Sequence, residues 1–163
     1  MNQPPTIYPM SLGERMSVFR ALVFAVWSDQ RLVATEVSVC RAVAEELDLF
    51  PLHDVGSLLR EGPPTLAELG LTKLGPWARR VAYATASWGC LADFEPDPAE
   101  RRALNLLRRQ LRLSREVAEL LDVGAALVQA HRRTAMPRVQ YRALLAAVAD
   151  VGSFGPDQEA DAA

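Results

Sequence analysis

Hydrophobic residues recur every three or four positions along most of this 163-residue chain, which is the period of an α-helix. In the clearest run, the apolar positions are Met16, Phe19, Leu22, Val23, Val26 and Trp27. No stretch of four or more residues alternates between apolar and polar positions as a half-buried strand does. The abundant alanine, leucine and arginine residues also favour helices. The pattern therefore predicts an all-α fold of seven or eight helices.

Capping signals mark where these helices begin and end. Ser11 and Glu14 have the spacing of a capping box, in which each side chain binds the backbone N–H of the other residue. The strongest start is Asp97-Pro98-Ala99-Glu100, with an N-cap, a proline at the first helical position and a glutamate at the third. On these signals we expect helices over about residues 11–28, 34–48, 51–60, 65–69, 76–92, 97–111, 114–133 and 137–150.

An internal repeat with an offset of 64 residues is the most specific feature of the sequence. The corresponding pairs are Asp29 and Asp93, Glu36 and Glu100, Cys40 and Leu104, Val43 and Leu107, Leu47 and Leu111, and Leu49 and Leu113. Repeats of supersecondary size pack against one another to bury their apolar faces, so we expect the two halves to pack around a pseudo-twofold axis.

This repeat predicts one domain over residues 11–150. Repeat one covers about 12–61, repeat two about 76–133, and an extra C-terminal helix 137–150. The extra helix either completes the core or offers an apolar stripe to a partner. We expect residues 1–10 to be a flexible lead-in and residues 151–163 to be a disordered acidic tail.

Each repeated unit consists of an apolar helix ending in Asp, a short loop, a Glu seven residues later in the first turn of the next helix, and a closing Leu. Over residues 12–133, this arrangement resembles the TerB-like domain of tellurite-resistance proteins. The resemblance implies an all-helical duplicated fold, a role in stress response and tellurite resistance, membrane-linked assemblies, and divalent-metal binding by the acidic loops. Gln30 and Phe94 stand where the family usually has a glycine after the Asp.

The acidic residues at the helix-loop-helix corners are candidate metal ligands. Carboxylate and loop carbonyl oxygens suit Ca²⁺, Mg²⁺ or Mn²⁺, and the second repeat offers more of them than the first. The candidates are Asp29, Glu36, Asp93, Asp97 and Glu100. The alternative is structural, because a glutamate in the first turn of a helix caps exposed N–H groups and interacts favourably with the helix dipole. We expect no cofactor other than such a cation.

The formal net charge of -2 conceals a strong asymmetry along the chain. Residues 1–100 carry a balance of -5, residues 101–142 carry +7, and residues 143–163 carry -4. Arginine forms paired hydrogen bonds with carboxylates and phosphates, so this basic stretch is a candidate surface for a protein partner or another anionic surface. The candidate partner-binding residues are Arg101, Arg108, Arg109, Arg112, Arg132 and Arg133. The alternative is a solvated helix face, and the lack of interleaved aromatic residues disfavours single-stranded nucleic acid.

Other features narrow the class of protein. Cys40 and Cys90 are too few for a disulfide scaffold, and no signal peptide or membrane-spanning run is evident, so we expect a cytoplasmic protein.

No catalytic residues are assigned, because no cluster of polar residues suggests an active site. We therefore expect a non-enzymatic scaffold or adaptor that binds a protein partner. The alternative is a divalent-cation sensor, and a small hydrolase or lyase is a weaker third.

Overall fold

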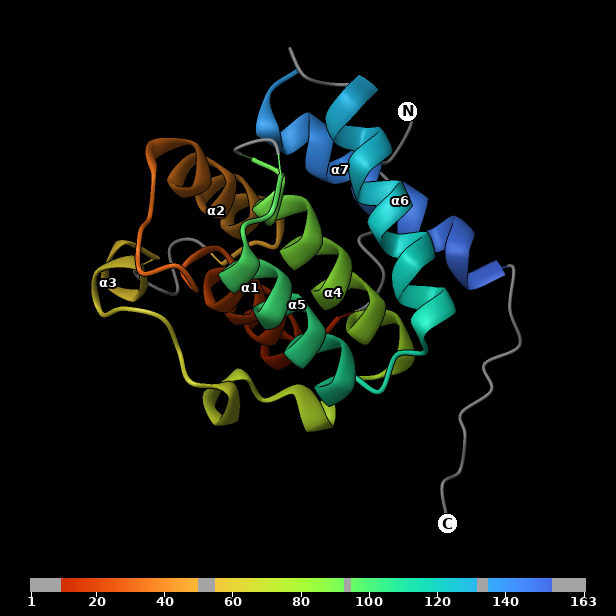
Figure 1. The fold of residues 1–163 in the computed structure, drawn as a ribbon, viewed down its shortest axis with the longest axis horizontal. Coiled ribbons are helices and arrows are strands. Elements are labelled where there is room, and N and C mark those ends of the chain that lie inside the picture. Colours follow the sequence, from red (N-terminus) through yellow and green to blue (C-terminus); the bar gives the residue numbers. More distant parts are fainter. Residues whose placement is uncertain (1–9, 50–54, 93–94, 132–134, 154–163) are drawn as a thin grey trace.

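The computed structural model describes residues 10–49, 55–92, 95–131 and 135–153, and these residues form helices and no strands. The predicted all-α class is therefore confirmed. None of the helices in these ranges is long and apolar enough to cross a membrane. The elements in Figure 1 are α1 (Leu12–Val26), α2 (Ala34–Glu46), α3 (Val55–Arg60), η1 (Leu66–Leu69), η2 (Leu71–Lys73), α4 (Pro76–Cys90), α5 (Pro98–Gln110), α6 (Arg115–His131) and α7 (Pro137–Ser153).

The helix starts follow the predicted capping chemistry. At α1, the Ser11 backbone N–H donates to Glu14 Oε2 at 2.9 Å and the Glu14 N–H donates to Ser11 Oγ at 3.2 Å. At α5, Asp97 and Glu100 form the same reciprocal pair at 2.8 and 2.9 Å. At α2, the Val33 N–H donates to Glu36 Oε2 at 2.9 Å, but valine has no acceptor for the return bond. Only half of the capping box therefore forms at α2.

Two differences from the predicted elements concern their type and length. Residues 66–69 form a 3₁₀ turn rather than an α-helix, and a second 3₁₀ turn, Leu71–Lys73, was not predicted. Helix α7 continues to Ser153, so residues 151–153 belong to the last helix and not to the predicted tail. The start expected at residue 51 for the third helix lies outside the described residues, which resume with α3 at Val55.

Helix α4 is the centre of the fold. Figure 1 shows α1 and α2 on one side of α4 and α6 and α7 on the other, and α4 contacts all four of these helices as well as α5. Every residue from 81 to 90 is buried. A helix buried on all sides must carry small or apolar side chains, which explains the Ala-rich sequence of α4.

The closest packing in the described structure joins α4 to α1, the pair of helices with the most extensive contact. A Cβ atom placed on Gly89 would collide with Leu22 Cδ1 and would lie 3.0 Å from Val26 Cγ1. Leu22 and Val26 are fully buried in α1 and have little space into which they could move. The absence of a side chain at residue 89 therefore sets the distance between the two helices.

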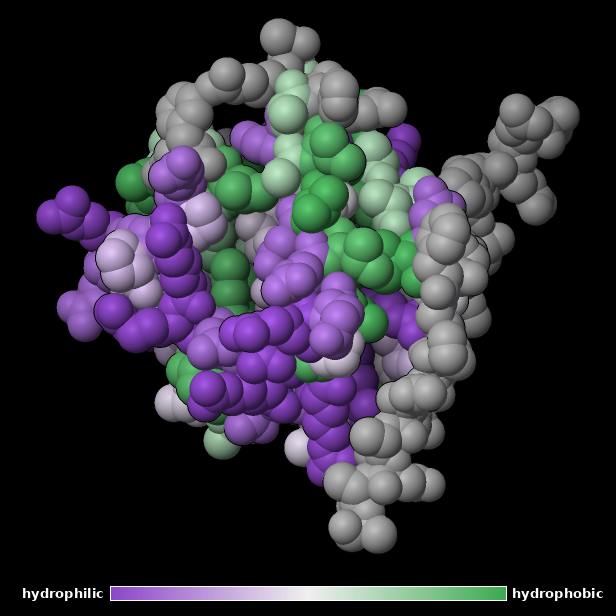
Figure 2. Space-filling model, turned by 45° about the vertical axis from the view of Figure 1, so that its right-hand side comes forward, coloured by the Kyte–Doolittle hydropathy of each residue, from purple (hydrophilic) through white to green (hydrophobic). Residues whose placement is uncertain are grey.

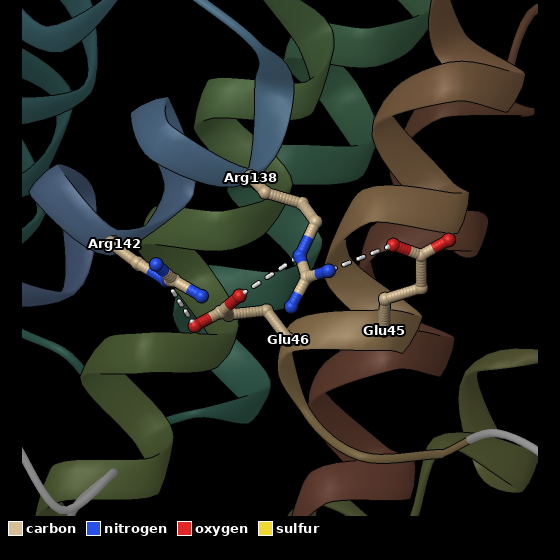
Figure 3. Close-up of polar contacts among 4 residues, drawn as sticks. All are labelled: Glu45, Glu46, Arg138 and Arg142. Atoms are coloured by element: carbon tan, nitrogen blue, oxygen red, sulfur yellow. Dashed lines mark hydrogen bonds and ion pairs between the residues drawn. The ribbon is translucent and has the colours of Figure 1, made fainter. Parts of the chain in front are cut away.

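Helix α7, which follows the two predicted repeats, is tied to α2 by a group of ion pairs (Figure 3). Glu46 is largely buried, with 8% of its side chain exposed, and accepts hydrogen bonds from Arg142 Nε at 2.6 Å and Arg138 Nε at 3.2 Å. Arg138 Nη1 also lies 3.4 Å from Glu45 Oε2. Both oxygens of the Glu46 carboxylate are thus paired, as a buried charge requires.

We predict that Gly89→Ala lowers the free energy of unfolding by about 1–3 kcal/mol, because the added methyl group overpacks the contact between α1 and α4. Urea denaturation followed by circular dichroism measures this change. Gly13→Ala is the matched control, since the nearest atom to its Cβ position is Ser11 Oγ at 3.8 Å, an ordinary contact. The control should change stability by less than about 1 kcal/mol. Equal effects of the two substitutions would contradict the assigned role of Gly89.

Candidate functional site

A cleft of about 450 Å³ lies between α4, α5 and α6 and is open to solvent. Three arginines line it, Arg101 and Arg108 from α5 and Arg115 from the start of α6. The other polar lining residues are Tyr83, Ser87, Asn105, Glu119 and Asp122. The cleft therefore combines three guanidinium groups with two carboxylates.

A hydrogen-bonded cluster lines the cleft where α4 meets α6. Asp122 accepts a hydrogen bond at each carboxylate oxygen, from Ser87 Oγ at 2.6 Å and from Tyr83 Oη at 3.2 Å. Tyr83 and Ser87 are four residues apart, so they share one face of α4. Both residues are buried, and Asp122 is half-buried. The cluster consequently fixes α6 against α4 and gives the cleft a rigid polar wall.

Burial changes the protonation behaviour of this cluster. Desolvation raises the pKa of Asp122, and the hydrogen bonds from Ser87 and Tyr83 oppose the rise because they favour the charged carboxylate. Burial also raises the pKa of Tyr83, and the neighbouring Asp122 raises it further, whereas the positive charge of Arg108 lowers it. Arg108 and Tyr83 line the same cleft, from α5 and α4 respectively.

The structure brings together only part of the predicted arginine surface. Arg101 and Arg108 line the cleft, whereas Arg109 and Arg112 are exposed outside it, and Arg132 and Arg133 lie outside the described residues. Arg115, which was not among the predicted binding residues, joins the first two. The arginines are therefore divided between the cleft and the surrounding surface.

Backbone and side-chain oxygens hold two of the cleft arginines in place. Arg101 Nε donates to the Pro96 carbonyl at 3.0 Å. Arg108 donates from Nη1 to the Leu113 carbonyl and from Nη2 to Asn105 Oδ1, both at 3.3 Å. Each guanidinium has five N–H donors, so these bonds orient the groups and leave donors for a ligand.

The predicted metal ligands take part in capping and turn bonds. Asp97 and Glu100 lie together in the capping box of α5, Glu36 caps α2, and Asp29 Oδ1 accepts the Arg31 backbone N–H at 2.8 Å. Asp93 lies outside the described residues. Within the part of the chain that the structure describes, no three His, Cys, Asp or Glu side chains form a group that could hold a metal ion. The structural role weighed for the glutamates is thus observed, while metal binding at these residues stays a prediction.

The two corner glutamates approach a buried thiol. Burial raises the pKa of Cys90, and the carboxylates of Glu100 and Glu36 raise it further. Burial and Glu36 also raise the pKa of Cys40, to about 12. Both cysteines are free and buried. Neutral thiols with raised pKa values are poor nucleophiles, so the pair belongs to the core.

Sequence reasoning missed Tyr83, Ser87 and Asp122. The sequence does contain one signal for them. Tyr83 and Ser87 carry hydroxyl groups and lie four residues apart in a helix whose neighbouring residues are small or apolar. Buried hydroxyl groups require partners, so this spacing predicts an acceptor on a neighbouring helix. Finding Asp122 as that acceptor required the packing of α6 against α4.

Comparisons with known proteins found no matching family model, no matching curated protein and no matching solved structure.

We predict that the raised pKa of Asp122 makes stability depend on pH. The folded state favours the protonated acid, so this contribution is fully present below the ordinary pKa of 3.8 and is lost as the pH rises through the higher folded value. The free energy of unfolding of the wild type, measured relative to Asp122→Asn, should fall as the pH rises above about 4. A carbon NMR titration of the Asp122 carboxyl group provides an independent measurement. The prediction is contradicted if the difference in unfolding free energy between the wild type and Asp122→Asn does not change with pH and the Asp122 carboxyl pKa is at or below 3.8.

Proposed function

We propose that the protein is a non-enzymatic helical adaptor that binds an acidic segment of a protein partner in the cleft between α4, α5 and α6. The observation that carries this proposal is the presence of Arg101, Arg108 and Arg115 around one cleft. Arginine is the residue best suited to bind carboxylates through paired hydrogen bonds. The basic balance of residues 101–142 favours the approach of an acidic partner.

The dimensions of the cleft suit a short acidic segment. A volume of about 450 Å³ accommodates a few side chains, and the open mouth does not require the ligand to be enclosed. Asp122 is held by two hydrogen bonds from α4, so its carboxylate occupies a fixed place in the lining of the cleft that the arginines also line. This carboxylate repels an acid that enters too deeply, so we infer that the partner's carboxylates bind at the arginine rim and not against the Tyr83 and Ser87 wall.

We also propose that the domain is a TerB-like duplication with a pseudo-twofold relation between its halves. The bounds of α1 and α2 are reproduced in α4 and α5 at an offset of 64 residues, from Leu12–Val26 to Pro76–Cys90 and from Ala34–Glu46 to Pro98–Gln110. The helix ends correspond as well. Asp48 and Arg112 both adopt a positive φ, of 55° and 54°, at the second residue beyond the ends of α2 and α5.

The glycine position of the TerB-like loop gives further support. Gln30 has a φ of 63°, a left-handed conformation that glycine adopts at no steric cost. The loop therefore retains the backbone conformation expected of the family's glycine although the residue differs. A part in stress response or tellurite resistance follows from the resemblance and belongs to this proposal, which also includes a cytoplasmic location.

We predict that an acidic peptide binds the cleft and that charge removal at the cleft weakens binding selectively. The probe is a fluorescein-labelled peptide of glutamates, compared with a glutamine peptide of the same length, in a fluorescence anisotropy titration. Arg108→Ala should lower the affinity by about 10-fold, because one charge-assisted interaction contributes about 1.5–3 kcal/mol. Added salt should weaken binding further.

Arg109→Ala is the matched control for this titration. Arg109 is the next residue on the same helix, is exposed and does not line the cleft. Its loss should change the affinity by less than about 3-fold, the range of an exposed ion pair. If both variants lost the same affinity for the glutamate peptide, the attraction would come from the whole basic surface and not from the cleft. If the glutamine peptide bound as tightly as the glutamate peptide, charge would have no role in binding.

A further inference from the structure

The cleft between α4, α5 and α6 has an apolar part in addition to its arginines. Leu104 of α5 and Ala118 of α6 are buried, with exposed fractions of 8% and 3%, and both line the cleft. Residues that are buried and still line a cleft form its deeper part, so these two side chains belong to its floor. The half-buried Leu91 and Pro96 and the exposed Ala126 complete the apolar lining. Mostly apolar walls with a few polar groups that orient the ligand are typical of binding sites.

The floor residue of α5 lies between two of the cleft arginines. Arg101, Leu104 and Arg108 are separated by three and then four residues, so they share one face of α5. Arg101 is exposed and Arg108 is half-buried, whereas Leu104 is buried. Seven residues of α-helix rise by about 10 Å, which is the length of about three residues of extended peptide. A short segment with one apolar side chain between carboxylates therefore matches the order of groups on this face.

We propose that the partner segment carries an apolar side chain of the size of leucine between its acidic residues. This side chain contacts Leu104 and Ala118 at the floor of the cleft, while the flanking carboxylates bind Arg101 and Arg108. The inference rests on the proposed binding of an acidic segment and adds the group that occupies the floor. A carboxylate at the floor would lose its hydration and approach Asp122, which lines the same cleft. An apolar side chain instead displaces water from apolar surface, which favours binding.

Apolar surface outside the cleft does not offer the same combination of groups. Figure 2 shows strongly hydrophobic side chains gathered in the upper part of one face of the molecule, above a more hydrophilic lower part. Helix α6 has an outward apolar stripe made of Leu120, Val123 and Leu127, with exposed fractions of 51%, 56% and 51%. Residues 116–131 contain no lysine or arginine, so a carboxylate beside the stripe finds no such cation on this part of α6. The cleft offers both apolar contact and arginines.

Two peptides of equal charge test the proposal in a fluorescence anisotropy titration of the full chain. One carries leucine between two pairs of glutamates, and the other carries glutamine in place of the leucine. The leucine peptide should bind about 10-fold more tightly, because burial of an apolar side chain contributes free energy of this order. Equal affinities, or tighter binding of the glutamine peptide, overturn this inference and leave the proposed function standing. If neither peptide binds, the proposed function fails and this inference fails with it.

Leu104→Ala tests the floor directly, because it removes most of the leucine side chain and leaves the arginines in place. The preference for the leucine peptide should fall below about 3-fold. The glutamine peptide should bind as it binds the wild type, which shows that the variant is folded. Leu106→Ala is the matched control, since Leu106 is an exposed leucine (44%) of the same helix that does not line the cleft, and it should keep the full preference. Equal preferences in the two variants overturn the proposal.

Nuclear Overhauser effects locate the bound leucine without any substitution in the chain. With a labelled chain and an unlabelled leucine peptide, the methyl groups of the peptide leucine should show these effects with the methyl groups of Leu104 and Ala118. Effects with Leu120 and Leu127 instead would place the leucine on the apolar stripe and overturn the proposal. The absence of effects at Leu104 and Ala118 in a saturated complex overturns it as well.

Discussion

The burial of residues 81–90 of α4 is the constraint on which the rest of the structure depends. Residues 81–90 are all buried, so the hydroxyl groups among them need partners within the protein. Ser87 and Tyr83 use Asp122 of α6, and Thr85 Oγ1 lies 3.0 Å from Tyr141 Oη of α7. The hydroxyl groups of one buried helix thus specify where the two C-terminal helices pack. The cleft exists because Asp122 is held against α4 while α5 approaches from the other side.

Helix α7 completes the core, which decides between the two roles considered from the sequence. Tyr141, Leu144 and Val148 are buried, and the Tyr141 ring stacks on Trp88 with centroids 5.7 Å apart. The ion pairs of Glu46 fix α7 against α2. The outward apolar stripe instead belongs to α6. From the sequence, α6 has two apolar faces, and only the packing of the other helices shows which of them the core uses.

Much of the fold follows from local chemistry that is visible in the sequence. The α1 and α5 starts agree with their capping residues, and the offset of 64 residues recurs in the helix bounds, because caps and apolar periodicity act over a few residues. The sequence does not predict the cleft, and charge alone does not separate Arg101 and Arg108, which line it, from Arg109, which does not. That distinction depends on the rotation of α5 against α4 and α6, and the partner of Tyr83 and Ser87 depends on contacts 35 and 39 residues away in sequence.

The cleft and the apolar stripe occupy different faces of the same helix, and this has a consequence for binding. Arg115, Glu119 and Asp122 face the cleft, whereas Leu120, Val123 and Leu127 face outward. The outward side chains therefore take no part in the cleft, whose α6 wall consists of residues on the side of the helix nearer α4 and α5. The position of Asp122 on that wall is fixed by Ser87 and Tyr83, so the orientation of α6 about its own axis depends on α4. The same orientation that gives the cleft its polar wall leaves Leu120, Val123 and Leu127 in solvent, because a helix rotated to bury them would withdraw Asp122 from its partners.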